Sequence, residues 1–323
     1  MNVSVIGCGR WGSFIAWYLD KFSHRVTLYG RPSSLHMKEL IESRRNDILT
    51  LPESVALSTE LGAAISSDVI ILSVFSQNLR PLMNEIKGYE PKNKIFVLCM
   101  KGIEIGSGKR LSEICEEYLD PSNKVAVWLG PGHVQEFVSG RPNCMVIDSD
   151  DQDVKDILIN EFSSSLIRFY IGEDLIGNEI GAAAKNVIGI AAGILDGLGL
   201  GTLKGALMSR GAREVSRLIV AMGGKEQSAY GLCHLGDYEA TVFSKHSHNR
   251  AFGEAFVTGG KFEGGLAEGY YTAKAIRDLE EKYKIEMPIC NAIYRVLYEN
   301  ADIKTAFNSL FERSLKKEFY TTI

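Results

Sequence analysis

The glycine-rich segment near the N-terminus constrains the fold more than any other part of the chain. Residues 2–6 are rich in β-branched side chains and predict a short strand, and Gly7-Cys-Gly-Arg-Trp-Gly12 follows it at once. A helical pattern then covers residues 14–19. In this context the first glycine permits a tight turn, the second lets backbone approach a pyrophosphate, and the third lets helix and strand pack closely. The pattern therefore predicts a dinucleotide-binding site at these glycines.

Further hydrophobic segments continue this organisation to about residue 174. They are almost continuously apolar, as expected of strands covered on both faces, and helical segments such as residues 111–118 separate most of them. The expected strands are residues 25–29, 68–74, 94–99, 125–129 and 145–147. Alternating strands and helices predict an α/β fold, with a Rossmann-like, doubly wound and mostly parallel sheet over residues 1–174.

The second half of the chain has a different pattern. No β-rich segment follows residue 174, and residues 175–221 carry Ala, Gly, Leu and Ile at helical spacing. Residues 273–282 and 292–299 also predict helices, with Pro288 between them as a breaker. We therefore expect an all-helical domain over residues 175–323.

Composition and charge exclude several classes of protein. The chain has 323 residues and a formal net charge of −4, which argues against a general binder of nucleic acid or of anionic membranes. The longest apolar stretch, residues 187–203, is rich in glycine and contains Asp196, so we expect no membrane span. No signal peptide is visible, and the six cysteines are scattered without metal-ligand spacing. We therefore expect a cytoplasmic protein with buried, reduced thiols and no metal site.

The end of the second predicted strand bears on the cofactor. An NAD-specific site usually places an acidic residue there, about 20 residues after the glycines. This chain has Tyr29-Gly-Arg31 instead. A guanidinium pairs well with a 2′-phosphate, so Arg31 favours NADPH or the use of both NADPH and NADH.

Three polar segments are candidates for catalysis. Lys101-Gly follows the strand at 94–99, and Gly130-Pro-Gly132-His follows the strand at 125–129, at the end where parallel sheets gather functional residues. Lys185-Asn186 lies within an apolar helical segment. A buried lysine beside a second lysine has a lowered pKa and can donate a proton. Alternatively, the side chain extends its ammonium group to the surface.

A fourth polar segment lies further along the chain. Asp237 could pair with a lysine, and Ser247-His-Asn-Arg250 offers several donors to a phosphate or carboxylate. Taken alone, such a segment is more often a polar loop with a helix cap.

Together these motifs resemble the bacterial-type NAD(P)-dependent glycerol-3-phosphate dehydrogenases, in the family's order and over the whole chain. The matching segments are residues 7–12, 101–104, 130–131, 179–188, 192–197, 209–211, 231–232, 235–237, 247–250, 268–269 and 286–289. The resemblance implies reduction of dihydroxyacetone phosphate to sn-glycerol 3-phosphate by reversible hydride transfer at C2. Such a reaction supplies a glycerophospholipid precursor.

The resemblance also implies that the helical domain binds substrate and supplies catalytic residues, and it implies roles for single residues. Lys185 would be the proton donor and acceptor at the C2 oxygen, and Lys101 and Asp237 would complete the catalytic group. The implied cofactor, NADPH or NADH, would contact Gly7, Gly9, Arg10, Trp11, Gly12, Arg31, Lys101, His248, Leu266 and Glu268. The phosphorylated small-molecule substrate would contact Lys101, Gly130, Gly132, Lys185, Asn186, Asp237, Ser247, His248 and Asn249.

The chain departs from the family pattern around the substrate. His248 stands where the family has an arginine that serves the phosphate and cofactor charges, and an imidazole does not replace a fixed bidentate cation. Arg250 and Arg210 are the alternative cations. Arg10 replaces a serine beside the pyrophosphate turn, and Gly132-His133 replaces a serine followed by an aromatic residue.

These departures leave the reaction type unchanged and the substrate open. One alternative is the same lysine-dependent chemistry on another phosphorylated or carboxylated hydroxy-ketone, and a second is a catalytically silent NADPH-binding protein. The segment 201–210 is also shorter than in the family. Glycine-rich helices over residues 182–207 would pack closely within or between subunits, so a homodimer is a further expectation.

Overall fold

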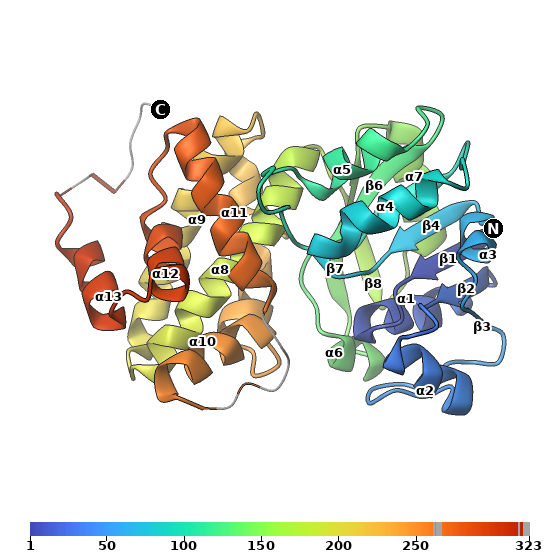
Figure 1. The fold of residues 1–323 in the computed structure, drawn as a ribbon, viewed down its shortest axis with the longest axis horizontal. Coiled ribbons are helices and arrows are strands. Elements are labelled where there is room, and N and C mark those ends of the chain that lie inside the picture. The colour runs from blue at the N-terminus through green and yellow to red at the C-terminus, as the bar shows by residue number, and fades with distance from the viewer. Residues whose placement is uncertain (261, 263–266, 316, 319–323) are drawn as a thin grey trace.

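A computed structural model describes residues 1–323 except 261, 263–266, 316 and 319–323. Figure 1 shows two halves side by side along the long axis of the molecule. The N-terminal half contains a sheet with its helices, and the C-terminal half consists of helices in its described residues. The predicted α/β fold class with a helical second part is confirmed.

The sheet contains eight strands in the order β3-β2-β1-β4-β5-β6-β7-β8. All neighbouring strands are parallel except β6 and β7, which pair antiparallel. The strands are β1 (Asn2–Ile6), β2 (Arg25–Tyr29), β3 (Ala56–Ser58), β4 (Val69–Leu72), β5 (Ile95–Leu98), β6 (Lys124–Leu129), β7 (Asn143–Ser149) and β8 (Ile167–Ile171). Each expected strand is present, whereas β3 and β8 were not expected. Because β1 lies between β2 and β4, the strand order changes direction at the end of β1, where nucleotide sites of such sheets form.

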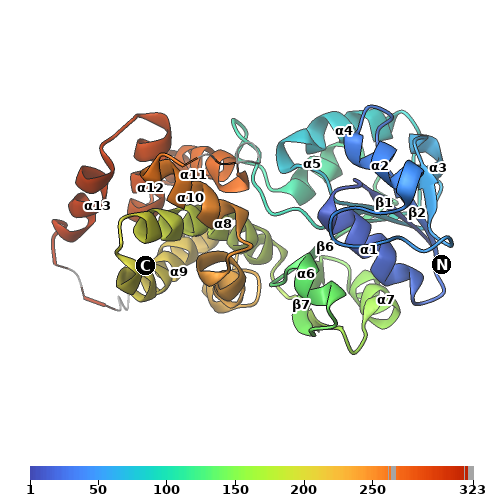
Figure 2. The same cartoon turned by 90° about the horizontal axis from the view of Figure 1, so that it is seen from below.

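Helices cover both faces of this sheet (Figure 2). One face packs against α1 (Arg10–Asp20), α2 (Leu35–Ser43), α6 (Val134–Val138) and α7 (Gln152–Phe162). The other packs against α3 (Leu61–Ile65), α4 (Leu79–Lys87) and α5 (Leu111–Tyr118). Burial on both faces explains why the strands read as continuous apolar segments.

The helical half is built around α8 (Leu175–Gly197). This helix is long and apolar enough to cross a membrane by length and composition, but 89% of its most apolar window is buried inside the protein. Around it lie α9 (Lys204–Ala221), α10 (His248–Thr258), α11 (Glu268–Tyr283) and α12 (Pro288–Tyr298), and α13 (Ile303–Phe311) packs on α12. Pro288 begins α12, because its missing N–H is tolerated in a first helical turn.

Small residues explain how α8 is enclosed. A Cβ atom at Gly193 of α8 would collide with the carbonyl oxygen of Arg250, and one at Gly253 of α10 would collide with that of Ile190. The backbones of α8 and α10 therefore touch, and the glycine-rich segment packs within the subunit. We propose residue 174 as the domain boundary, because β8 ends at Ile171 and α8 begins at Leu175.

Candidate active site

The glycine-rich turn connects β1 to α1 as its sequence predicts. Gly7 has φ of +117°, a conformation that favours glycine, and a Cβ there would collide with the Ser73 carbonyl. A Cβ at Gly12 would collide with the Gly7 carbonyl oxygen. Glycine at position 12 therefore lets α1 lie close to the end of β1. At Gly9, the N-cap of α1, a Cβ would meet no described atom within 4 Å. Open space beside a helix N-terminus suits a pyrophosphate, so these residues fit a dinucleotide.

The other predicted cofactor residues near this turn lie in different environments. Arg10 begins α1 and forms an ion pair with Asp47 at the surface. Trp11 is half-buried, and its ring lies 5.3 Å from that of Phe14. Arg31 is exposed just after β2. Leu266 lies outside the described residues. A guanidinium at Arg31 is free to reach a phosphate at the edge of the site.

The ends of β5 and β6 meet as expected. Lys101 follows β5, and its Nζ donates to the carbonyl oxygen of Gly130, which follows β6, at 2.7 Å. The same ammonium lies 2.7 Å from Oδ2 of Asp237 in the helical half. Lys101 therefore joins the sheet to the second half at the carboxyl ends of the strands.

Lys185 completes this cluster from the middle of α8. Its side chain is 9% exposed, and its Nζ lies 2.6 Å from Asp237 Oδ2 and 2.7 Å from Thr241 Oγ1. The ammonium is thus buried and paired, and does not extend to the surface. Burial lowers the pKa of Lys185 to about 8; Asp237 opposes this shift and Lys101 adds to it.

Asp237 is shared by the two lysines. Both ammonium groups contact Oδ2, while Oδ1 is buried and has no hydrogen-bond partner among the described residues. Two ammonium groups around one carboxylate leave a net positive charge when both lysines are protonated. Such a cluster favours an oxygen that becomes negative during a reaction.

Two asparagines connect this cluster to the neighbouring helices. Asn186 donates from Nδ2 to the carbonyl of Lys101 at 3.0 Å, and its Oδ1 accepts from Asn249 Nδ2 at 3.0 Å. The Oδ1 of Asn249 accepts from the backbone N–H of Gly269 at 2.9 Å. The two carboxamides therefore hold Lys101, α10 and α11 in a fixed relation.

The segment from Ser247 begins α10. Ser247 is its N-cap and accepts the backbone N–H of Arg250 at 3.3 Å, which confirms the helix cap. His248 is exposed, and its ring lies 4.6 Å from that of Phe262. Partial burial, and then the charge of Arg10 on the opposite half, lower the pKa of His248. Arg10 therefore lies close enough to influence the position where the family has an arginine.

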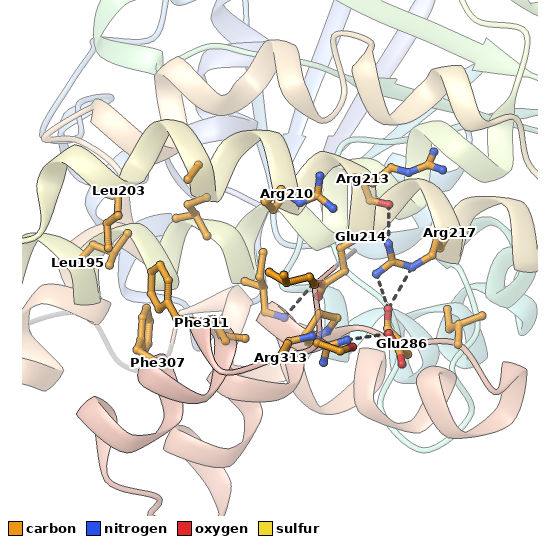
Figure 3. Close-up of a pocket in the computed structure, with 18 residues that line it drawn as sticks. Leu195, Leu203, Arg210, Arg213, Glu214, Arg217, Glu286, Phe307, Phe311 and Arg313 are labelled. Atoms are coloured by element: carbon orange, nitrogen blue, oxygen red, sulfur yellow. Dashed lines mark hydrogen bonds and ion pairs between the residues drawn. The ribbon is translucent and has the colours of Figure 1, made fainter. Parts of the chain in front are cut away.

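Neither alternative cation replaces that arginine. Arg250 is 2.6 Å from Asp196 and 3.1 Å from Glu254. Arg210 lines a separate cavity of about 610 Å³ between α9 and α13, with Arg217 and Phe311 (Figure 3). This cavity shares no lining residue with the lysine cluster.

Glu268 connects the halves on another side. This first residue of α11 accepts the backbone N–H of Ser76 at 3.1 Å and the Ser76 hydroxyl at 2.6 Å. Burial raises the pKa of the carboxyl, and the two bonds from Ser76 oppose the shift. The loop after β4 is thereby fixed to the start of α11.

Two residues near the cluster were not among the predicted site residues. Thr241 contacts Lys185 and lies one helical turn after Asp237, a spacing that points to a shared face. His133 follows Gly130 and Gly132 and donates from Nε2 to the carbonyl oxygen of Ala240 at 2.9 Å. No sequence signal connects His133 to Ala240, because the contact joins segments 107 residues apart.

The cysteines of this protein form no disulfide bonds. All six cysteines are free and five are buried, whereas Cys144 is half-buried at the start of β7. Among the residues that the structure describes, no group of three or more His, Cys, Asp or Glu side chains could hold a metal ion.

Comparisons with known proteins agree with this geometry. The family model of the NAD-dependent glycerol-3-phosphate dehydrogenase N-terminus matches residues 2–155, and that of its C-terminus matches residues 174–308. Glycerol-3-phosphate dehydrogenases (NAD(P)+) from a Thermoanaerobacter species and from Clostridium botulinum are each 36% identical, over 99% of this chain and 99% of their own length. The crystal structure of glycerol-3-phosphate dehydrogenase from Coxiella burnetii has a TM-score of 0.91 and 28% identity, covering 97% of this chain and 99% of that chain. The chain belongs to the family of NAD-dependent glycerol-3-phosphate dehydrogenases.

Proposed function

We propose that this enzyme reduces dihydroxyacetone phosphate to sn-glycerol 3-phosphate with NADPH or NADH, and so supplies a glycerophospholipid precursor. The observation that carries the proposal is the buried contact of Lys185 and Lys101 with one oxygen of Asp237, at 2.6 and 2.7 Å. The names of the curated relatives support it, since they are glycerol-3-phosphate dehydrogenases that use NAD(P)+.

Lys185 provides the proton. Reduction of a ketone turns its oxygen into an alkoxide, and the bound nicotinamide cofactor supplies the hydride. The Lys185 ammonium donates a proton to the C2 oxygen as this negative charge appears, and the neutral amine takes the proton back in the reverse direction. A pKa near 8 suits both directions at neutral pH. The charge of Lys101 stabilises the same oxygen, while Asp237 holds both ammonium groups in place.

The cofactor is assigned to the glycine-rich turn. Gly7, Gly9 and Gly12 receive the pyrophosphate at the N-terminus of α1, and Arg31 pairs with the 2′-phosphate of NADPH. The remaining cofactor contacts assigned in this chain are Arg10, Trp11, Lys101, His248 and Glu268.

The substrate is assigned to the space between the sheet ends and α10. Gly130 and Gly132 line the sheet side, while Asn186, Ser247, His248 and Asn249 line the helical side. His248 lies at the first position of α10, where a helix favours a phosphate. An imidazole in place of an arginine favours, as a second candidate, another phosphorylated or carboxylated hydroxy-ketone reduced by the same lysine.

We also propose that the enzyme works in the cytoplasm as a homodimer, on a small molecule and without nucleic acid or a membrane span. The negative net charge supports the absence of nucleic acid, and the burial of α8 inside the protein supports the absence of a membrane span. Sedimentation of the purified protein measures the oligomeric state.

The decisive experiment measures NADPH and NADH oxidation by the purified enzyme with dihydroxyacetone phosphate. Related hydroxy-ketones and 2-oxo acids are compared in parallel, and Lys185→Ala is the control. We expect rapid oxidation that depends on Lys185, with kcat of the variant lower by several orders of magnitude and nearly normal NADPH binding. Turnover that is unchanged in Lys185→Ala would remove the lysine from proton transfer, and tight cofactor binding without any turnover would indicate the silent alternative.

A further inference from the structure

The short π-helix η5 (Glu239–Phe243) is held in place by side chains from other elements. The carbonyl oxygen of Ala240 accepts from His133 Nε2 at 2.9 Å, and that of Val242 accepts from Lys204 Nζ at 3.1 Å. Its Thr241 hydroxyl accepts from Lys185 at 2.7 Å. Single π-turns are rare in proteins as a whole, and those that occur often lie at functional sites. The position of this turn, which begins two residues after Asp237, is therefore set by its neighbours.

His133 is the contribution of the sheet half to this turn. It lies in the loop after β6, where the Gly130 carbonyl is bonded to Lys101. Gly132 has φ of +148°, and a Cβ there would collide with the Phe137 ring. On the other side, the ring of His246 lies 5.7 Å from that of His133. The imidazole is thus fixed both by its own loop and by the segment before α10.

We propose that His133 is a positioning residue, which holds the Asp237–Thr241 turn against Lys185 through its hydrogen bond to Ala240. The inference rests on the proposed function, because it concerns the proton donor of that reaction. Without the bond, the turn is free to move away from Lys185, and both oxygens that contact the ammonium move with it.

The charges around His133 are compatible with this role. Lys185 of α8, Asp237, Glu136 of α6 and the His246 ring face it. Burial, followed by the charge of Lys185, lowers the pKa of His133, and its bond to Ala240 and the two acids oppose the shift. The neutral ring with its proton on Nε2 still donates to the carbonyl. The bond is therefore present at neutral pH.

Three variants separate the hydrogen bond from the ring. His133→Phe keeps an aromatic ring without a donor, and His133→Gln restores an N–H close to the position of Nε2. His246→Phe is the matched control, since it keeps a ring beside His133 and leaves the bond to Ala240 intact. For each variant, kcat, both KM values and the pH dependence of dihydroxyacetone phosphate reduction are measured, and thermal unfolding reports folding.

We expect His133→Phe to lower kcat by about 10- to 100-fold, as misplacement of a catalytic group does, with the KM for NADPH unchanged. The kinetic pKa of Lys185 is expected to fall, because Asp237 and Thr241 both stabilise its ammonium form. His133→Gln should recover most of the rate and of the pKa, and His246→Phe should resemble the wild type.

An unchanged pH profile and kcat in folded His133→Phe would overturn the inference, as would the same pKa shift in His246→Phe. Failure of the proposed function gives a different result, namely a wild-type enzyme that does not reduce dihydroxyacetone phosphate. In that case the three variants are compared on whichever hydroxy-ketone the wild type reduces.

Discussion

Lys185 and Lys101 contact the same oxygen of Asp237, at 2.6 and 2.7 Å, while the other oxygen of this carboxylate is unpaired among the described residues. One carboxylate does not fully neutralise two ammonium groups in a buried site. The proton on Lys185 is consequently held less tightly than that of an ordinary lysine, which makes it available for transfer.

This arrangement predicts opposite pH dependences for the two directions of the reaction. Reduction needs the charged Lys185, whose pKa is about 8, so kcat/KM for reduction is expected to fall as pH rises through about 8. Oxidation of glycerol 3-phosphate needs the neutral amine and should rise over the same range. Initial rates in both directions between about pH 6 and 10 measure this. Parallel pH profiles in the two directions would contradict the assignment.

Two glycines of the turn are expected to respond differently to alanine. Gly9 has φ of −71° and open space at its Cβ position, so Gly9→Ala should leave stability unchanged and weaken NADPH binding by at least about tenfold. Gly12→Ala forces a Cβ into the Gly7 carbonyl and should destabilise the fold by about 2–4 kcal/mol. Thermal unfolding and NADPH titration of both variants test the pair. Equal loss of stability in the two variants would mean that Gly9 also has a packing role.

A fixed cation at position 248 is expected to improve substrate binding. His248→Arg should lower the KM for dihydroxyacetone phosphate by roughly five- to tenfold, because a guanidinium pairs with phosphate at any neutral pH. Since Arg10 influences His248, the gain should be larger in an Arg10→Ser background. Steady-state kinetics of the single and double variants measure both effects. A higher KM in His248→Arg would show that the histidine is adapted to a different ligand.

The buried carboxyl of Glu214 is expected to make the free energy of unfolding depend on pH. It is buried beneath the cavity of Figure 3 and accepts the backbone N–H groups of Ile289 and Cys290, each at 2.8 Å. Burial raises its pKa from 4.5 to about 7. A raised pKa in the folded state means that this contribution to stability is complete below about pH 4.5 and is lost as pH rises through about 7.

Glu214→Gln removes this titration. The free energy of unfolding of the wild type should therefore fall, relative to the variant, by about 3 kcal/mol between pH 4.5 and pH 7. Urea unfolding of both proteins at the two ends of this range gives the difference. An identical pH dependence in the two proteins would assign the titration to other groups.

Much of the fold could be predicted from the sequence, because buried parallel strands are continuous apolar segments. The two unexpected strands lack that signal. β3 (Ala56–Ser58) has three residues, and β8 (Ile167–Ile171) is an edge strand in which Arg168 and Tyr170 are exposed. The antiparallel pairing of β7 was also not predictable, since a strand buried on both faces looks the same in either direction.

Site residues could be predicted where the chemistry requires a residue type that is unusual for its surroundings in the sequence. Lys185 is conspicuous among small apolar residues, and Lys101 follows a buried strand. Contacts between segments far apart in the sequence could not be predicted in this way. Glu268 bonds to Ser76 across 192 residues, and the bond of His133 is to a backbone carbonyl, which every residue has. Such contacts depend on the final packing of the two halves and carry no local signal.

Several of the side chains that join the two halves belong to the site itself. Lys101 bonds to Asp237, Asn186 to the Lys101 carbonyl, and Ser76 to Glu268. Separation of the halves would break these bonds and remove Lys101 from Asp237, whereas Lys185 would keep its contact with Asp237, since both belong to the helical half. In a separated molecule the two lysines would no longer share one carboxylate, and the pKa of Lys185 would lose the lowering by Lys101. The group of two lysines on one carboxylate is thus complete only where the two halves are in contact.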